Sequence, residues 1–154
     1  MTGGGLDDGA VLTLELPDLP EAAGAARKAL TALNGSLHLI SEARLRDVQL
    51  LVSELVANAF RHARSQGEPL HLAVLATDAV LRVEIRDAGP GFDPAVVDPA
   101  PIEAGRGKGL QIVRALAPRW GVEQGDGTTV WFEIDRPQRG RPLPIEPSTR
   151  RPRR

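Results

Sequence analysis

The chain contains no cysteine, no internal repeat and no long apolar run. Without cysteine, neither a disulfide framework nor a thiolate metal site can form. No stretch approaches the roughly 20 apolar residues that span a bilayer, and no signal-peptide core is present. These absences lead us to expect a cytoplasmic protein that does not associate with a membrane.

Charge is unevenly spread along the 154 residues, although the net value is only −1. Residues 136–154 contain seven Arg and one Glu, whereas residues 1–135 contain 12 basic and 19 acidic residues, about −7. Apolar residues make up 42% and charged residues 25%, as in a globular domain with one core. We expect a flexible Gly-rich segment over 1–10, a folded acidic domain over 11–135 and a disordered basic Pro/Arg-rich tail over 136–154.

That tail has two interpretations at this point: a solvated segment without a partner, or a basic arm that contacts nucleic acid or an acidic protein. Sequence-specific nucleic-acid binding is not expected.

The apolar pattern predicts eight helices and strands in the order β-α-α-β-β-loop-α-β-β. The first helix is expected to open at the capping pair Asp18 and Glu21 and to stop at Asn34-Gly35. This order is typical of an α/β (α+β) two-layer sandwich, with helices on one face of a mixed, mostly antiparallel sheet. The predicted ranges are strand 11–16, helix 18–33, helix 41 to about 65, hairpin strands 70–76 and 80–87, helix 110–116, a strand near 122 and strand 128–134.

The long central helix carries two polar residues at the edge of its buried stripe. Apolar residues recur at intervals of three and four from Leu45 to Ala63, and Glu54 and Asn58 lie one turn apart beside them. A carboxylate can accept a proton, and an amide oxygen can bind a hard cation such as Mg²⁺. Ordinary helix-surface polar residues would give the same pattern, so the helix alone does not identify a site.

Two strand ends direct polar side chains toward the core. Asp87 continues the inward phase of Leu81, Val83 and Ile85, and Thr128 shares its phase with Val130. An inward carboxylate requires a hydrogen-bond donor, which a ligand amine could supply. Gly89 and Gly91 after the strand would let the backbone approach that ligand, although a turn capped by Asp87 is an equally simple explanation.

A glycine-rich stretch precedes the last predicted helix. Its residues are Gly105, Arg106, Gly107, Lys108, Gly109 and Leu110. Exposed amides at a helix N-terminus favour phosphate, and two basic side chains add positive charge. The stretch is neither a P-loop nor a dinucleotide fingerprint, and by itself it could be a linker.

Together, in this order, the four stretches resemble the GHKL ATPase superfamily over residues 11–135. Glu54 to Asn58 resembles its N box, Asp87 to Gly91 and Gly105 to Gly109 its glycine boxes, and Gly127-Thr128 its last motif. The resemblance implies the Bergerat fold and an ATP-Mg²⁺ site under a mobile lid. By this likeness Asp87 binds the adenine amine with Thr128 assisting, Asn58 ligates Mg²⁺, and the glycines border the phosphates. The implied nucleotide-binding set is Asn58, His62, Asp87, Gly89, Gly91, Gly105, Arg106, Gly107, Lys108, Gly109, Leu110 and Thr128.

Within the superfamily the chain looks most like the anti-sigma-factor serine/threonine kinases, through Arg61-His62-Ala63 and Trp120-Gly121-Val122. Those proteins hold a sigma factor and phosphorylate an antagonist protein, and the likeness makes Glu54 the catalytic base. A homodimer is compatible with it. The second glycine box is closer to the histidine-kinase pattern, but we expect no room for a dimerisation domain with a phosphoacceptor His. An ATP-gated binding module without kinase activity remains the alternative function.

Overall fold

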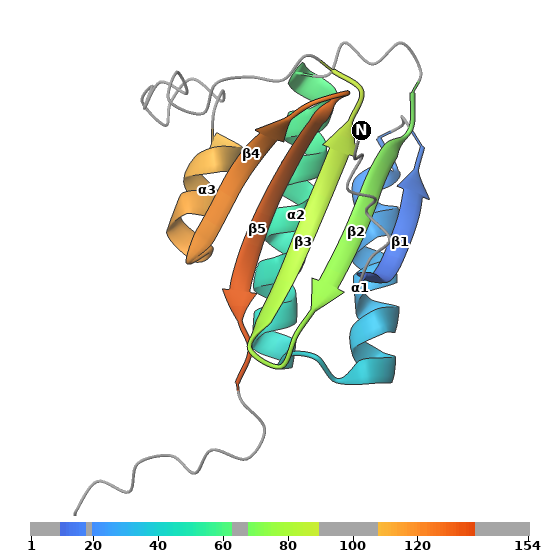
Figure 1. The fold of residues 1–154 in the computed structure, drawn as a ribbon. Helices are drawn as coiled ribbons and strands as arrows, with labels where there is room; N and C mark the ends of the chain where they lie inside the picture. The colour runs from blue at the N-terminus through green and yellow to red at the C-terminus, as the bar shows by residue number, and fades with distance from the viewer. Residues whose placement is uncertain (1–9, 18–19, 63–67, 90–107, 138–154) are drawn as a thin grey trace, which may run out of the picture.

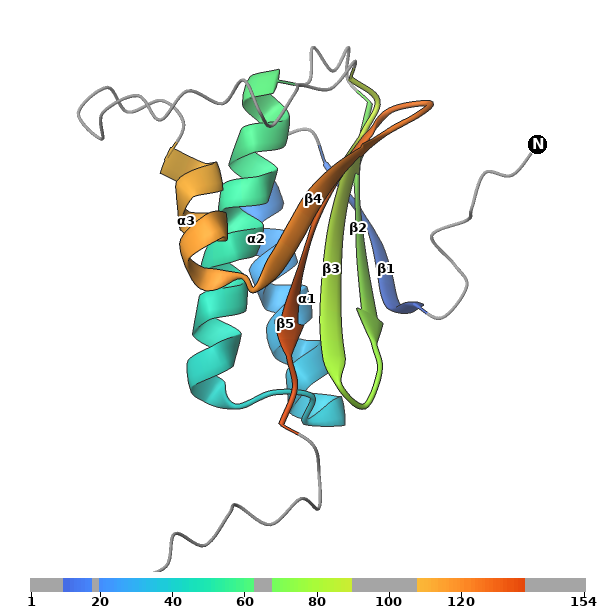
Figure 2. The same ribbon diagram turned by 60° about the vertical axis from the view of Figure 1, so that its left-hand side comes forward.

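The computed structural model describes residues 10–17, 20–62, 68–89 and 108–137, which form two layers (Figures 1 and 2). One layer is a five-stranded sheet in the order β1-β2-β3-β5-β4, in which every pairing between described strands is antiparallel. The helices cover one face of it and leave the other open. The predicted α+β sandwich is therefore confirmed. The bounds are β1 Ala10–Leu16, α1 Ala22–Leu37, α2 Glu42–His62, β2 Leu70–Ala76, β3 Val80–Asp87, α3 Lys108–Leu116, β4 Arg119–Gln124 and β5 Thr128–Asp135.

The helix α2 runs along the middle of the sheet and supplies much of the core. Ser41 caps its start, because the backbone N–H of Arg44 donates to the Ser41 hydroxyl at 3.2 Å. Each apolar side chain that α2 buries contributes about 1.5–3 kcal/mol to stability, relative to leaving it in water. None of the helices in the described ranges combines the length and apolarity that a bilayer crossing requires. The stripe predicted from the sequence is buried at Leu45, Val48, Leu51, Val52, Leu55, Val56 and Ala59.

The end of α1 differs from the prediction. The helix does not stop at Asn34-Gly35 but continues to Leu37, and His38 closes it in the left-handed conformation. Asn34 is buried, and its amide both donates to the carbonyl of Ile40 and accepts from the Ile40 N–H, at 3.1 and 3.0 Å. Asn34 therefore fixes the turn between α1 and α2 instead of ending the helix. At the other end Glu21 is the N-cap without a side-chain cap, and Asp18 lies outside the described residues.

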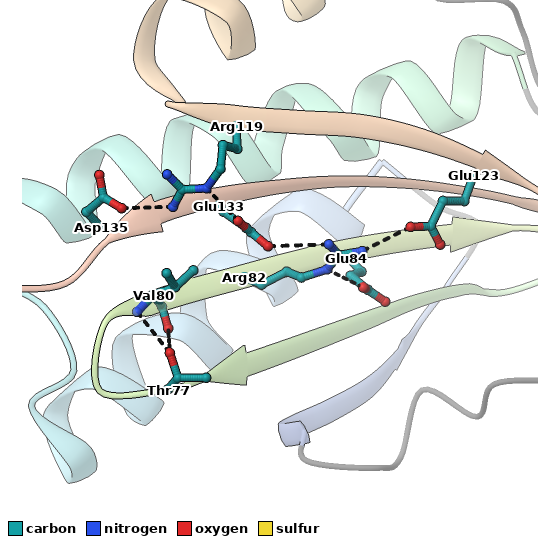
Figure 3. A network of polar contacts seen from close by, with 8 residues as sticks. All are labelled: Thr77, Val80, Arg82, Glu84, Arg119, Glu123, Glu133 and Asp135. Carbon is teal, nitrogen blue, oxygen red and sulfur yellow. Dashed lines mark hydrogen bonds and ion pairs between the residues drawn. The ribbon is translucent and has the colours of Figure 1, made fainter.

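The hairpin of β2 and β3 forms as the pattern predicts. Its turn is held by the Thr77 hydroxyl, which accepts from the N–H groups of Ala79 and Val80 at 3.3 and 3.1 Å (Figure 3). Because side chains alternate along a strand, β3 and β5 each send every second residue into the core. That alternation continues to Asp87 and Thr128, which face each other as register partners.

Candidate functional site

Four elements bring their ends together at one end of the molecule, the upper end in Figure 1. They are the C-terminal end of α2, the end of β3, the start of β5 and the first turn of α3, and both views agree on this arrangement. The helix α2 packs against both α3 and β3. Residues that the sequence places 70 positions apart, such as Asn58 and Thr128, therefore belong to one end of the fold.

The strand ends form a small buried polar cluster. Asp87 is 7% exposed and Thr128 is 1% exposed. One carboxylate oxygen of Asp87 accepts from the backbone N–H of Gly89 at 2.6 Å, and the Thr128 hydroxyl donates to the Gly89 carbonyl at 3.1 Å. The turn after β3 is thus fixed from both sides by side chains of the two strands. A carboxylate can accept several hydrogen bonds, since each of its two oxygens has two lone pairs.

Gly127 makes this cluster sterically feasible. A Cβ at this position would lie 2.2 Å from the Asp87 carbonyl oxygen and 3.4 Å from the Cα of Ala88. A contact of 2.2 Å does not occur, so any side chain here would separate the strands beside Asp87 and Thr128. In the sequence Gly127 is recognisable only as part of the last motif. The requirement for glycine there follows from a close approach between two strands that the sequence does not display.

Asn58 presents an unsatisfied polar group. It is 5% exposed, and within the described part of the chain its buried Nδ2 has no hydrogen-bond partner. An unsatisfied buried polar atom costs about 1–3 kcal/mol and is rare in native proteins, where a ligand, an ion or an ordered water can complete it. Turning the amide by 180° exchanges its oxygen and nitrogen, so the same position can offer either an acceptor or a donor. Glu54, one turn earlier on α2, is half-buried.

The remaining predicted site residues fall at the edges of the described structure. His62 is the last residue of α2, and Lys108, Gly109 and Leu110 are the first three residues of α3. These three therefore occupy a helix N-terminus, where backbone N–H groups favour anions. The others, Gly91, Gly105, Arg106 and Gly107, lie outside the described residues.

The geometry can be tested against a bound nucleotide with its metal. A buried acceptor at Asp87 fits an amine donor, the amide of Asn58 fits an oxygen ligand, and the start of α3 fits phosphate. Among the described residues no group of three or more His, Asp or Glu side chains could hold a metal by itself. Proteins usually hold Mg²⁺ through one or two side chains together with substrate phosphates.

Comparison with known proteins identifies a relative in sequence and two similar folds. An uncharacterized protein of Streptomyces coelicolor, SCO4941, is 36% identical over 85 residues, which cover 53% of this chain and 79% of that protein. Among solved structures, the fold matches the RsbU and RsbW domains of Rv1364c from Mycobacterium tuberculosis, with a TM-score of 0.62 and 20% identity over 81% of this chain. The alignment spans 32% of that longer chain. A chain of the Pseudomonas aeruginosa SiaB-SiaC complex gives a TM-score of 0.59 and 14% identity, covering 82% of this chain and 90% of that one.

At these identities the two solved structures establish a shared fold. The family is established by the sequence: the model of the histidine kinase-like ATPase domain matches residues 16–134. This range runs from the last residue of β1 to the next-to-last residue of β5 and contains β2, β3, β4 and the helices α1, α2 and α3. This match confirms the resemblance to the GHKL superfamily that the four motifs indicated. The protein belongs to the histidine kinase-like ATPase domain family.

Proposed function

We propose that the protein binds Mg-ATP at the end of the sheet where α2, β3, β5 and α3 meet, and transfers the γ-phosphoryl group to a serine or threonine of an antagonist protein. In this proposal it is an anti-sigma factor, which holds a sigma factor until its antagonist competes. The observation that carries the proposal is the buried Nδ2 of Asn58, which has no hydrogen-bond partner among the described residues and lies one helical turn from Glu54, in a domain of an ATPase family.

Adenine recognition is assigned to the strand ends. Asp87 would accept a hydrogen bond from the adenine amine, and Thr128, its register partner, would line the same pocket. The bond that Gly89 donates already fixes the carboxylate, so the acceptor is oriented before the nucleotide arrives. This preorganisation supports a specific purine site over a general anion site.

Phosphate binding is assigned to the start of α3 and the residues before it. The backbone N–H groups of the first turn would face the phosphates, and Gly105, Arg106 and Gly107 with Lys108, Gly109 and Leu110 would border them. Asn58 would ligate Mg²⁺, and His62 would lie at the edge of the nucleotide site. When bound, ATP would supply the phosphoryl group, and its Mg²⁺ would partly neutralise the charge of that group.

Glu54 is assigned as the general base. It would accept the proton of the attacking hydroxyl while the hydroxyl oxygen bonds to the γ-phosphorus and ADP leaves. Its half-buried position on α2 supports this role. Glu54 lies one turn before Asn58, the proposed metal ligand, so the two side chains are neighbours on the same side of the helix.

The partner class is inferred from likeness. The chain shares its fold with the RsbW-containing protein and with a chain of the SiaB-SiaC complex, which is an assembly of two proteins. An ATP-gated binding module, in which nucleotide controls partner affinity and no phosphate is transferred, is the second candidate, since a nucleotide fold can bind without turnover. A homodimer is compatible with either function.

The variant Glu54→Gln separates these functions, because it keeps the size of the side chain and removes its charge. We expect Mg-ATP affinity within a few fold of wild type, with phosphate incorporation into the antagonist slowed roughly 100-fold or more. Glu42→Gln makes the same chemical change at the exposed start of α2 and serves as the matched control. Normal transfer by Glu54→Gln would remove its assignment as the base. Tight ATP binding without transfer by the wild type, with a confirmed partner, would favour the binding module.

A further inference from the structure

The face of the sheet opposite the helices carries a connected group of charged side chains (Figure 3). Arg82 donates to Glu84 at 2.6 Å, to Glu123 at 3.2 Å and to Glu133 at 3.4 Å. Arg119 contacts the second oxygen of Glu133 at 2.7 Å and Asp135 at 2.8 Å. Four carboxylates thus share two guanidinium groups. Arg86 lies on the same face of β3, two residues beyond Glu84, and adds a positive charge at that side of the group. We call these six side chains the open-face cluster: Arg82, Glu84, Arg119, Glu123, Glu133 and Asp135.

The open-face cluster has a rigid base. The Arg82 guanidinium lies 4.1 Å above the centre of the Trp131 ring, and that ring lies over Gly121, where a Cβ would come within 2.7 Å of it. Burial opposes the charge of Arg82, but its carboxylate neighbours, Glu84 first, raise its pKa above the ordinary guanidinium value. Arg82 therefore keeps its positive charge among these carboxylates. The unbalanced charge of the cluster is carried by Glu123 and Asp135, because their side chains are each 64% exposed and each is contacted by one arginine.

The chain itself contains a segment of opposite charge, which follows β5 in the sequence. Residues 139–154 include six Arg and one Glu, whereas residues 1–135 carry about −7. The segment starts three residues after Arg136, which directly follows β5 and is held there by hydrogen bonds. The Arg136 N–H donates to the Ala79 carbonyl at 2.8 Å, and its side chain donates to the carbonyls of Leu39, at 2.9 Å, and Thr77.

The length of segment 139–154 and its covalent tether to the sheet both favour contact within one chain. An eight-residue strand such as β5 is about 27 Å long, and a chain can extend by about 3.3–3.6 Å per residue. Arg139 and Arg141 can therefore reach Asp135, and the group from Arg150 to Arg154 can reach Glu123 at the other end of the cluster. Single exposed ion pairs contribute about 0–1 kcal/mol, but tethering gives such weak contacts an effective concentration in the millimolar range.

From these observations we propose that the open-face cluster is a docking surface for the arginine-rich segment of the same chain, residues 139–154, which binds through Glu123 and Asp135. The docking requires neither nucleotide nor phosphoryl transfer, so it can hold or fail independently of the proposed function.

The experiment uses the full chain and its own tryptophans as reporters. Because the chain has no cysteine, Ser148→Cys provides one attachment point for a nitroxide spin label. Trp131 lies on the open face, whereas Trp120, opposite Phe132 on the neighbouring strand, packs on the helix side. In a ¹⁵N spectrum the two indole N–H signals therefore report the two faces. We expect the nitroxide to broaden the Trp131 indole signal more than the Trp120 signal, and chemical reduction of the label to restore both.

Charge variants test the cause of that difference. Glu123→Lys with Asp135→Lys should remove the preferential broadening, while Glu21→Lys with Glu68→Lys, an equal charge change at exposed positions just before α1 and β2, should preserve it. Raised salt should also abolish it, which tests the proposal even if the charge variant folds poorly. Equal broadening of both indoles, or a preference that survives Glu123→Lys with Asp135→Lys, would overturn the proposal. Broadening centred on Asp87 and Gly89 would also overturn the proposal. In a sample that mixes spin-labelled and unlabelled copies, broadening that passes only from one copy to another would overturn it too, because the contact would then be between chains.

Discussion

The steric requirement at Gly127 gives a prediction whose size follows from the structure. In Gly127→Ala the new methyl group would lie 2.2 Å from the Asp87 carbonyl oxygen, whereas ordinary contact begins at 3.4 Å, so the two backbones must separate by about 1.2 Å. Forcing one extra carbon into a packed position typically costs about 1–3 kcal/mol. We therefore expect a loss of that size in the free energy of unfolding, measured by urea denaturation.

The same shift should weaken the nucleotide site, because Gly127 adjoins Thr128 and contacts the backbone of Asp87. We expect the affinity for Mg-ATP to fall at least about tenfold, equivalent to about 1.4 kcal/mol. Gly125→Ala is the matched control, since its Cβ would meet nothing within 4 Å, and its stability should change by less than about 0.5 kcal/mol. Equal stability of the two variants would refute the steric argument. Lower stability of Gly127→Ala with undiminished affinity for Mg-ATP would show that Asp87 and Thr128 do not belong to the nucleotide site.

Three further predictions concern other parts of the fold. Asn34→Ala removes both hydrogen bonds to Ile40 and should lower the free energy of unfolding by about 1–3 kcal/mol without changing Mg-ATP affinity, as urea curves and calorimetry can show. Gly35→Ala, at an exposed position in α1 with nothing within 4 Å, should raise stability by about 0.4–1 kcal/mol, and a lower urea midpoint would contradict this. Chelation of Mg²⁺ should weaken ATP binding by the wild type more than by Asn58→Ala, and an equal loss in both would remove Asn58 as a ligand.

Much of the fold can be predicted from the sequence because its signals are local. The buried stripe of α2 follows from apolar residues spaced by three and four, and the inward direction of Asp87 and Thr128 follows from alternation along β3 and β5. The order of elements also follows from the pattern. Each of these inferences depends on residues within one element.

The features that could not be predicted depend on contacts between elements. The sequence Asn34-Gly35 looks like a helix end, but Asn34 hydrogen-bonds to Ile40 after the turn, and this contact lets α1 continue to Leu37. The need for glycine at position 127 arises from a backbone 40 residues earlier. Alternation places Arg82 on the open face, but only the strand order shows that it lies between carboxylates of β3, β4 and β5.

The nucleotide site at the strand ends is tested most directly by calorimetric titration of Mg-ATP into the wild type and Asp87→Asn. Asparagine keeps the size of the side chain and can still accept from the Gly89 N–H, but it replaces the second acceptor oxygen with a donor. Asp78→Asn, the same change on the exposed hairpin turn, is the control. We predict measurable binding by the wild type and Asp78→Asn, and an affinity at least about tenfold lower for Asp87→Asn, because a buried acceptor is lost. Equal affinity of all three proteins, or no binding by the wild type, would contradict the account.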